Sequence, residues 1–416
     1  MNPNIFENIE FFLLLPVALL ALNLTKYLGR SIFVVAMSGI SLIFIASIPG
    51  IKYVYLVTTS AILVIVYLLL YVSISRTHLK QTCFWVAISI WLSYFIGVKY
   101  QFWGYFSPVI LDIRTLLNES LMPIVGLSFL IVKIISVIVD IRAERLKNLP
   151  FLDYLAYILW FPTFMSGPIE RLGNFRVSID NAAANRQNIL QAYFDNLPRF
   201  LLGCLKVFVV AGVLHKDALP FANGGIIPAA AMQVYFAAII YYWYEYMNFS
   251  GYSDIAISSS RVIGINLPEN FDHPYMATSL TNLWRRWHMT LAAWLRDYIY
   301  YPLFFILMKK FGAKTKAAQT YLSALSIFIT FAICGLWHGE TYGMLFFGIS
   351  SGLVLAVEVL LSSNFDKPLG AYLKAHPLQA QCYPWVARLV TFHIAIITFG
   401  PVLLSNEQFF VLFGLD

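Results

Sequence analysis

Long apolar stretches dominate this sequence. Residues 31–49, 53–74 and 121–141 each supply the roughly 20 mostly apolar residues that a helix needs to cross a bilayer. Of the 416 residues, 60% are hydrophobic and 12% are charged, whereas about a quarter of an average soluble domain is charged. The mean hydropathy of +0.73 excludes a soluble enzyme, a disordered chain and a fibrous protein. The chain is therefore predicted to be an all-α polytopic membrane protein.

Further apolar stretches bring the expected total to about ten to twelve membrane helices. They cover residues 11–24, 82–98, 200–214, 229–247, 252–265, 290–308, 320–337, 343–361 and 384–404. The stretches 102–113 and 151–165 are short and interrupted by Pro108 and Pro162, which predicts re-entrant or interfacial helices. We find no internal repeat and no long linker, so residues 1–416 are expected to form a single transmembrane domain.

Lys and Arg residues lie in short clusters between the apolar stretches and give a net charge of +7. The clusters at residues 26–30, 76–80 and 142–147 fall on loops that would face the same side, which is the pattern of basic cytoplasmic loops. This threading places the N-terminus outside the cytoplasm. The basic clusters thus indicate membrane lipid, not nucleic acid, as the neighbour. The four cysteines are scattered without metal-ligand spacing, so no metal site is expected.

A first cluster of ionisable residues, Trp284-Arg-Arg-Trp-His288, lies beside a predicted span, where such groups are costly and often functional. If residues 282–298 formed one helix, Trp284 and His288 would share one stripe, and Arg286 and Asp297 another. We therefore expect Arg286 and Asp297 to pair, because an unpaired charge in the membrane is costly. The alternative for this cluster is an interfacial helix with a belt of Trp residues and snorkelling arginines.

A second cluster, Trp337-His338-Gly339-Glu340, closes an apolar helix that has no other ionisable group after Lys316. Gly339 would allow close approach of backbone or ligand, and Trp337 would form a wall beside the histidine. Neutral imidazole is well suited to accept a proton near pH 7, and burial would keep it neutral. His338 is therefore a candidate general base, and a packed core histidine is the alternative.

Two further polar patches, residues 166–171 with Pro168 and residues 248–254 with Asp254, are predicted to be breaks between helices. Structural support and a direct role both remain open for them. The run Gly348-Ile-Ser-Ser-Gly352 matches G-x-S-x-G, but a nucleophile elbow needs a strand–turn–helix context. This run lies inside an apolar stretch, so Ser350 is not expected to be a nucleophile.

Several separated motifs resemble the membrane-bound O-acyltransferase family. They are residues 164–171, residues 249–254, Trp-Arg-Arg-Trp-His288, Arg296-Asp297-Tyr298 and Gly-Leu-Trp-His338-Gly, in that order over most of residues 120–360. They resemble most the bacterial branch, which includes the alginate O-acetylation membrane protein and the teichoic-acid D-alanyl transferase. The resemblance implies a ring of membrane helices around a central tunnel, where a cytoplasmic acyl thioester meets an acceptor from the other side.

The resemblance also implies roles for individual residues. His338 corresponds to the central histidine of the family, and His288 corresponds to the second motif position. We expect both to be catalytic. Trp284, Trp287, Trp337, Glu340 and Asp254 are expected to contact substrate or line the tunnel, and Arg286, Asp297, Pro168 and Gly339 to support the site.

The resemblance predicts an enzyme of the bacterial inner membrane without a tightly bound cofactor. Acetyl-CoA or an acyl carrier protein would donate the acyl group, and an exported polysaccharide or an extracytoplasmic acyltransferase partner would receive it. Asp254 favours the acetyl-transferring type, whereas the apolar run after Tyr301-Pro302 favours the D-alanyl type. The rival class is a proton-coupled transporter or flippase that uses His338, Glu340 and Asp254 as a relay. The lack of an inverted repeat argues against it.

Overall fold

The computed structural model describes residues 9–48, 53–99, 126–185, 188–218, 231–339 and 341–413. Helices and their connections make up these residues, and no strand occurs among them, which confirms the predicted all-α class. The chain forms two compact units, and each is described on its own. The first unit contains Met1–Leu201 and Ser253–Pro268, and the second contains Leu202–Tyr252 and Glu269–Asp416. The prediction of a single domain over residues 1–416 stays a prediction.

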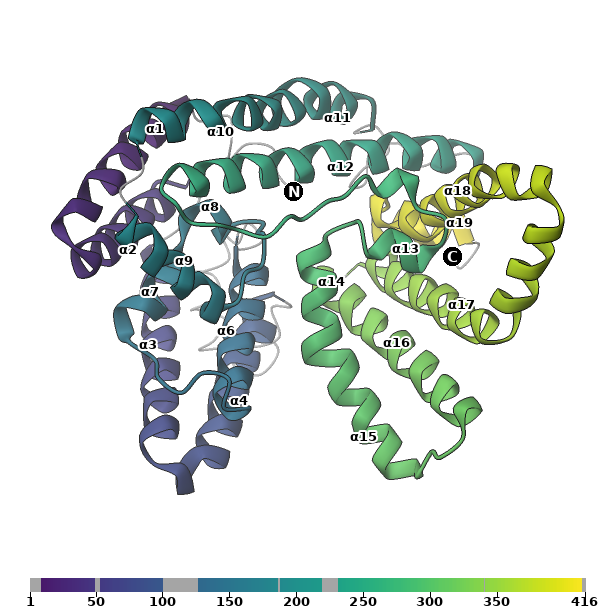
Figure 1. Ribbon diagram of the computed structural model, residues 1–416, viewed down its shortest axis with the longest axis horizontal. Helices are drawn as coiled ribbons and strands as arrows, with labels where there is room; N and C mark the ends of the chain where they lie inside the picture. The colour runs from purple at the N-terminus through teal and green to yellow at the C-terminus, as the bar shows by residue number, and fades with distance from the viewer. Residues whose placement is uncertain are drawn as a thin grey trace. The chain divides into compact units, whose positions relative to one another are not determined.

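Figure 1 labels the α-helices along the chain. The first unit contains α1 (Ile9–Thr25), η2 (Lys26–Leu28), α2 (Arg30–Ala46), α3 (Tyr53–Ser75), η3 (Thr77–Leu79), α4 (Lys80–Lys99), α6 (Leu127–Arg142), α7 (Phe151–Leu159), α8 (Phe161–Phe164), α9 (Leu172–Ala184), most of α10 (Ile189–Cys204) and the end of α12 (Ala231–Val262). The second unit contains the remaining parts of α10 and α12 and also η5 (Leu205–Ala211), α11 (Gly212–Ala218), η7 (Pro274–Met276), α13 (Leu280–Trp284), α14 (Met289–Leu295), η8 (Arg296–Tyr300), α15 (Tyr301–Phe311), α16 (Lys316–His338), α17 (Tyr342–Ala375), α18 (Pro377–Phe399), η9 (Gly400–Leu403) and α19 (Asn406–Phe413).

Six helices among the described residues are long and apolar enough to cross a membrane, which confirms a polytopic membrane protein. They are Val57–Ser75, Lys80–Lys99, Ile189–His215, Lys316–His338, Tyr342–Ser363 and Pro377–Leu403. Two shorter apolar helices, Leu14–Leu28 and Arg30–Ala46, precede them. The stretch 290–308 is helical but is not one of the six, and the stretch 102–113 lies outside the described residues. The total of ten to twelve spans and the ring around a tunnel stay predictions.

Helix α12 occupies a region for which two spans were predicted, residues 229–247 and 252–265, with a break at 248–254. The chain is instead helical without interruption over 32 residues, which corresponds to about 48 Å. At Gly251, an added Cβ would lie 2.8 Å from both Gly203 O and Lys206 Cβ. The glycine thus permits a close helix contact within the second unit. The predicted break at 248–254 is wrong, whereas the one at 166–171 is confirmed, because this stretch lies outside α8 and α9.

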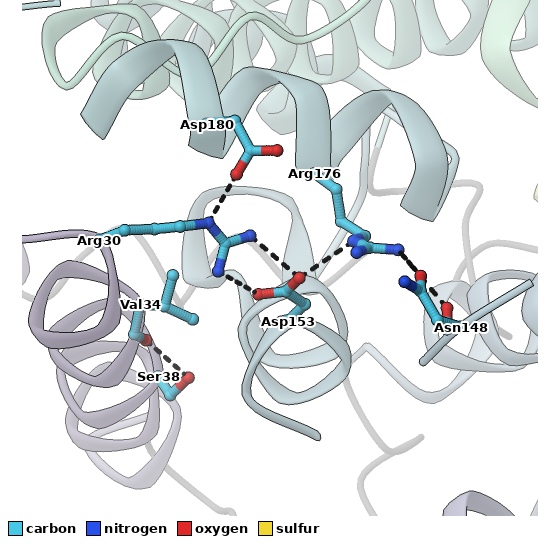
Figure 2. A network of polar contacts seen from close by, with 7 residues as sticks. All are labelled: Arg30, Val34, Ser38, Asn148, Asp153, Arg176 and Asp180. Atoms are coloured by element: carbon cyan, nitrogen blue, oxygen red, sulfur yellow. Dashed lines mark hydrogen bonds and ion pairs between the residues drawn. The ribbon is translucent and has the colours of Figure 1, made fainter. Parts of the chain in front are cut away.

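A network of charged side chains ties together three helices of the first unit (Figure 2). Asp153 of α7 has a side chain that is 1% exposed, and Arg30 of α2 donates to both of its carboxylate oxygens at 3.0 Å. Arg176 of α9 donates its Nε–H to the same carboxylate at 3.0 Å and an Nη1–H to Asn148 Oδ1 at 2.7 Å. Arg30 also reaches Asp180 of α9 at 2.6 Å. The two guanidinium charges balance the two carboxylates, so the buried charge of Asp153 is compensated.

Two of the basic loops lie at the same end of the first unit. Lys80, at the start of α4, forms an ion pair of 2.7 Å with Glu144, which follows α6. Arg142, at the end of α6, lies 4.1 Å from the centre of the Phe84 ring, a cation–π contact. The topology predicted from the basic loops requires the loops at 76–80 and 142–147 to lie on the same side of the membrane. These contacts agree with that requirement. Their assignment to the cytoplasm stays a prediction.

Candidate functional site

His288 lies at a break between two helices of the second unit. Helix α13 ends at Trp284, and α14 begins at Met289. His288 itself has φ 43° and ψ 51°, a left-handed conformation that few residues other than glycine adopt. Its side chain is buried, with 4% of the residue exposed. The condition for the shared stripes, one helix over residues 282–298, is therefore not met, since the backbone turns at His288.

A neighbouring extended segment stabilises this break. The backbone N–H of Met289 donates to Asn270 O at 2.9 Å, and the hydroxyl of Thr290 donates to Asn270 Oδ1 at 2.9 Å. The backbone N–H of Asp272 donates to Arg286 O at 2.9 Å. These bonds satisfy backbone and side-chain groups that a continuous helix would have satisfied within itself. Asn270 is 1% exposed and was missed as a site-supporting residue. Its only signal in the sequence is its place in a polar run after an apolar stretch.

The predicted pairing of Arg286 with Asp297 is also wrong. Arg286 donates to Asp272 Oδ2 at 3.0 Å and to Asp272 O at 3.1 Å. Asp297 accepts a hydrogen bond of 2.9 Å from Arg296. The pairing rested on an uninterrupted helix from residue 282 to residue 298, and the turn before α14 removes that register. Arg286 instead links the turn to the extended segment that supports it.

Aromatic rings enclose the two tryptophans of this cluster. Trp287 stacks on Tyr242 with ring centres 5.0 Å apart and planes at 9°, and Trp284 lies 5.8 Å from Phe347. The rings of Phe249 and His288 are nearly perpendicular, with their centres 4.5 Å apart. A small cavity with a volume of about 10 Å³, room for about one water molecule, lies beside these rings. Its walls are formed by Tyr242, Leu280, Leu283, Trp284, Trp287, Phe347, Ala395, Thr398 and Phe399, none of which is charged.

His338 is the last residue of α16, and its side chain is exposed. The burial expected for it from the sequence is therefore wrong. Its ring lies 4.7 Å from Trp337 and 5.9 Å from Phe347. Because Phe347 also contacts Trp284 and lines the cavity, one ring connects the two motif clusters.

Glycines fix the position of α16 against α17, and the two helices lie side by side in Figure 1. A Cβ added at Gly348 would lie 2.6 Å from Phe331 O and 2.9 Å from Gly335 Cα. A Cβ added at Gly352 would lie 2.9 Å from Phe328 O. The two glycines of the G-x-S-x-G match at 348–352 therefore lie where α17 contacts α16. Small residues four apart let the backbones of two helices approach closely.

The two histidines lie close enough to influence each other. His288 is outside the six candidate membrane-spanning helices. Burial lowers its pKa well below the ordinary value, and the nearby His338 lowers it further. His288 is therefore a neutral imidazole near pH 7, able to donate one hydrogen bond and accept another. The second unit thus brings together His288, His338, Trp284, Trp287 and Trp337.

Other predicted site residues lie elsewhere. Asp254 belongs to the first unit, where it accepts a hydrogen bond of 2.9 Å from Arg199 within an ion pair. Pro168 is in the irregular stretch between α8 and α9 of the same unit. Gly339 follows the last residue of α16, and an added Cβ there would lie 3.1 Å from Met344 Cγ. Glu340 lies outside the described residues. No group of three or more His, Cys, Asp or Glu side chains within the described part of the chain could hold a metal ion.

Comparison with known proteins supports an acyltransferase. The family model described as MBOAT, membrane-bound O-acyltransferase family, matches residues 66–402. The teichoic acid D-alanyltransferase of Streptococcus thermophilus is 30% identical over 247 residues, which cover 58% of each chain. The probable alginate O-acetylase AlgI of Pseudomonas putida is 31% identical over 287 residues, which cover 64% of this chain and 55% of the relative. The teichoic acid D-alanyltransferase of Bacillus subtilis is 27% identical over 299 residues, 70% of this chain and 71% of the relative.

The aligned regions span little more than half the length of the first two of these relatives. The relatives carry two different names, an O-acetylase and a D-alanyltransferase, at similar levels of identity. Identity alone therefore does not separate the two acyl groups.

Proposed function

Because this chain belongs to the membrane-bound O-acyltransferase family, we propose that it transfers an acetyl group from a cytoplasmic thioester to a hydroxyl. The hydroxyl would belong to an exported cell-envelope polysaccharide or to an extracytoplasmic partner. The main observation that supports this proposal is that His288 and His338 lie close enough to interact electrostatically. They lie near a cavity with aromatic walls. The chain would lie in a bacterial inner membrane with its N-terminus outside the cytoplasm. Acetyl-CoA or an acyl carrier protein would donate the acyl group.

In this mechanism, His338 acts as the general base. Its exposed imidazole at the end of α16 would take the proton of the acceptor hydroxyl as the oxygen attacks the thioester carbonyl. The new C–O bond forms, the C–S bond breaks, and the proton passes from His338 to the leaving thiolate. Attack by the acceptor itself is proposed, without an acyl-enzyme, because the G-x-S-x-G match at 348–352 is a contact between helices and not a nucleophile elbow.

His288 would act in the same reaction as a hydrogen-bond donor. A neutral, buried imidazole can donate to the oxygen of the thioester carbonyl, where negative charge develops. Trp284, Trp287 and Trp337 would exclude water from the reacting atoms. The protein would then need no metal ion, because the two histidines supply the proton acceptor and the donor.

The uncharged side chains around the small cavity, which has room for about one water molecule, favour acetyl over D-alanyl as the acyl group at this site. A D-alanyl ester carries an ammonium group, whose burial without a carboxylate partner is costly. None of the nine side chains that line the cavity is charged. D-alanyl transfer from a carrier protein to a teichoic-acid-like polymer remains the alternative, supported by the relatives of that name.

The proposal is tested by thioester cleavage with the purified protein in detergent, with no ion gradient. Acetyl-CoA, acetyl carrier protein and D-alanyl carrier protein are supplied separately with a polysaccharide acceptor. We expect acceptor-dependent cleavage of an acetyl thioester, and a loss of about 10²–10⁴-fold in His338→Gln. His288→Ala is expected to retain more activity than His338→Gln if it only stabilises the carbonyl oxygen.

His376→Gln serves as the matched control, because His376 is a half-buried histidine of the same unit that follows the end of α17 and stacks on Tyr372. It should retain wild-type activity. Cleavage of only the D-alanyl thioester would favour the alternative acyl group. A protein that cleaves none of these thioesters would contradict acyl transfer and return attention to a transporter.

A further inference from the structure

Glu358 is a carboxylate that the proposed chemistry does not use. It lies on α17, inside the candidate membrane-spanning segment Tyr342–Ser363. It is the only ionisable residue between residues 343 and 361. A charged group within a membrane helix is costly and needs compensation. The compensation here comes from a different part of the chain.

Glu358 accepts three hydrogen bonds from the start of α13. Its Oε1 accepts from the backbone N–H of Leu280 at 2.6 Å. Its Oε2 accepts from the backbone N–H of Thr281 at 2.8 Å and from the hydroxyl of Thr281 at 2.7 Å. The first N–H groups of a helix have no partner within the helix, so they are free to bind an acceptor from outside. Glu358 therefore holds the beginning of α13 against α17.

A local cap completes this arrangement. The hydroxyl of Ser279 accepts from the backbone N–H of Asn282 at 3.1 Å, as an N-cap residue commonly does. The cap from Ser279 is local, whereas the cap from Glu358 comes from a residue 78 positions along the chain. Glu358 therefore determines where α13 lies relative to α17, which Ser279 cannot do.

Helix α17 is thus the element shared by both candidate catalytic histidines. Through Glu358 it holds α13, which carries Trp284 and leads directly into the turn at His288. Through Gly348 it holds α16, which ends at His338. A shift of α13 along α17 would change the separation of His288 from His338.

We propose that Glu358 is a positioning residue for acyl transfer, which fixes His288 and Trp284 relative to His338 by binding the start of α13. This inference rests on the proposed function. A carboxylate is suited to the task because both of its oxygens only accept hydrogen bonds when it is ionised. The amide of a glutamine would direct its N–H₂ group at one of the donors. Misplacement of a reacting group by about 1 Å can cost about 100-fold in rate.

The test compares Glu358→Gln with wild type in the thioester assay. We expect kcat to fall by about 10–100-fold, with the KM for the thioester donor changed by less than about twofold. A loss of folded protein alone would not produce this pattern once rates are expressed per folded molecule, measured by size-exclusion chromatography. Glu358→Asp keeps the carboxylate on a shorter side chain and should recover part of the lost kcat.

Two further variants keep the test decisive. Glu407→Gln removes an exposed carboxylate of the same unit and should behave as wild type. Thr281→Val removes only one of the three hydrogen bonds, so it tests the inference even if Glu358→Gln fails to fold. We expect it to lower kcat by about threefold to tenfold, the range of one ordinary hydrogen bond, because the two bonds from backbone N–H groups to the carboxylate remain.

The two proposals fail in different ways. A wild-type protein without acyl transfer would overturn the proposed function and, with it, the inference about Glu358. An active wild type whose folded Glu358→Gln and Thr281→Val variants keep a normal kcat would overturn the inference alone. A fall in turnover per total protein that matches the fall in folded protein, with kcat per folded molecule unchanged, would also overturn it, since Glu358 would then support stability only.

Discussion

Gly348 offers a direct test of how His338 is positioned. The substitution Gly348→Ala adds one methyl group where α17 meets α16. That carbon would lie 2.6 Å from Phe331 O, 2.9 Å from Gly335 Cα and 3.0 Å from Gly335 N. All three are backbone atoms, so no change of side-chain rotamer can make room. The two helices would have to separate, and His338 would move with α16.

The size of the effect follows from two opposing contributions. Overpacking of a tight contact typically costs about 1–3 kcal/mol. Replacing glycine by alanine within a helix gains about 1 kcal/mol in helix propensity. Gly370 lies on the same helix, and an added Cβ there has no atom within 4 Å. Gly370→Ala should therefore gain the propensity without the clash. The difference between the two variants, about 1–3 kcal/mol, isolates the cost of the contact.

The measurement is the free energy of unfolding in detergent, followed by SDS titration or thermal unfolding, together with thioester turnover. We expect Gly348→Ala to be less stable than Gly370→Ala and to lose turnover. Gly39→Ala provides a second control in the apolar helix α2, where an added Cβ also meets nothing within 4 Å. Equal stability of Gly348→Ala and Gly370→Ala would refute the close contact of α16 with α17.

Two further predictions concern charge. Because the pKa of His288 is lowered from 6.5 in the folded protein, the unfolded chain binds a proton more readily, and stability should fall as the pH drops below about 6.5. The free energy of unfolding should change with pH by at most about 1.4 kcal/mol per pH unit because of this residue. Unfolding curves of His288→Gln between about pH 5 and 8 should not show this dependence. Asp153→Asn should destabilise the protein by about 3 kcal/mol. This is the lower end of the range for removing one partner of a buried ion pair, because both arginines keep access to water. The exposed Asp180→Asn should cost about 1 kcal/mol or less, and similar unfolding free energies for the two variants would contradict the network.

Local hydrophobicity was enough to predict several helices closely. The predicted spans 53–74 and 320–337 correspond to α3 (Tyr53–Ser75) and α16 (Lys316–His338). The sequence also indicated His288 and His338 as candidates, and the structure places both in the second unit; their catalytic roles stay predictions. These features depend on composition within a short window, which is what periodicity and motif spacing report.

The failures share a physical cause. A polar, glycine-containing run was expected to end a helix at 248–254, but Gly251 allows close packing inside α12. The shared stripe of Arg286 and Asp297 required one helix over residues 282–298, but hydrogen bonds donated to Asn270 and one donated by Asp272 stabilise a turn there. In both places, contacts between distant segments decide the local conformation, and a window of neighbouring residues does not contain them.

Glu358 is a residue whose contact with a distant segment could be anticipated from the sequence. His338 attracted attention because it is a lone ionisable residue beside an apolar run, and the same reasoning applies to Glu358 within residues 343–361. The cost of a charge in a membrane helix means that each such residue must have a partner, so its presence predicts an interaction. It does not predict which one. The partners at Leu280 and Thr281 are backbone and hydroxyl groups without charge, and no charge pattern could have identified them. Only the tertiary structure connects the carboxylate on α17 to the helix that leads into His288.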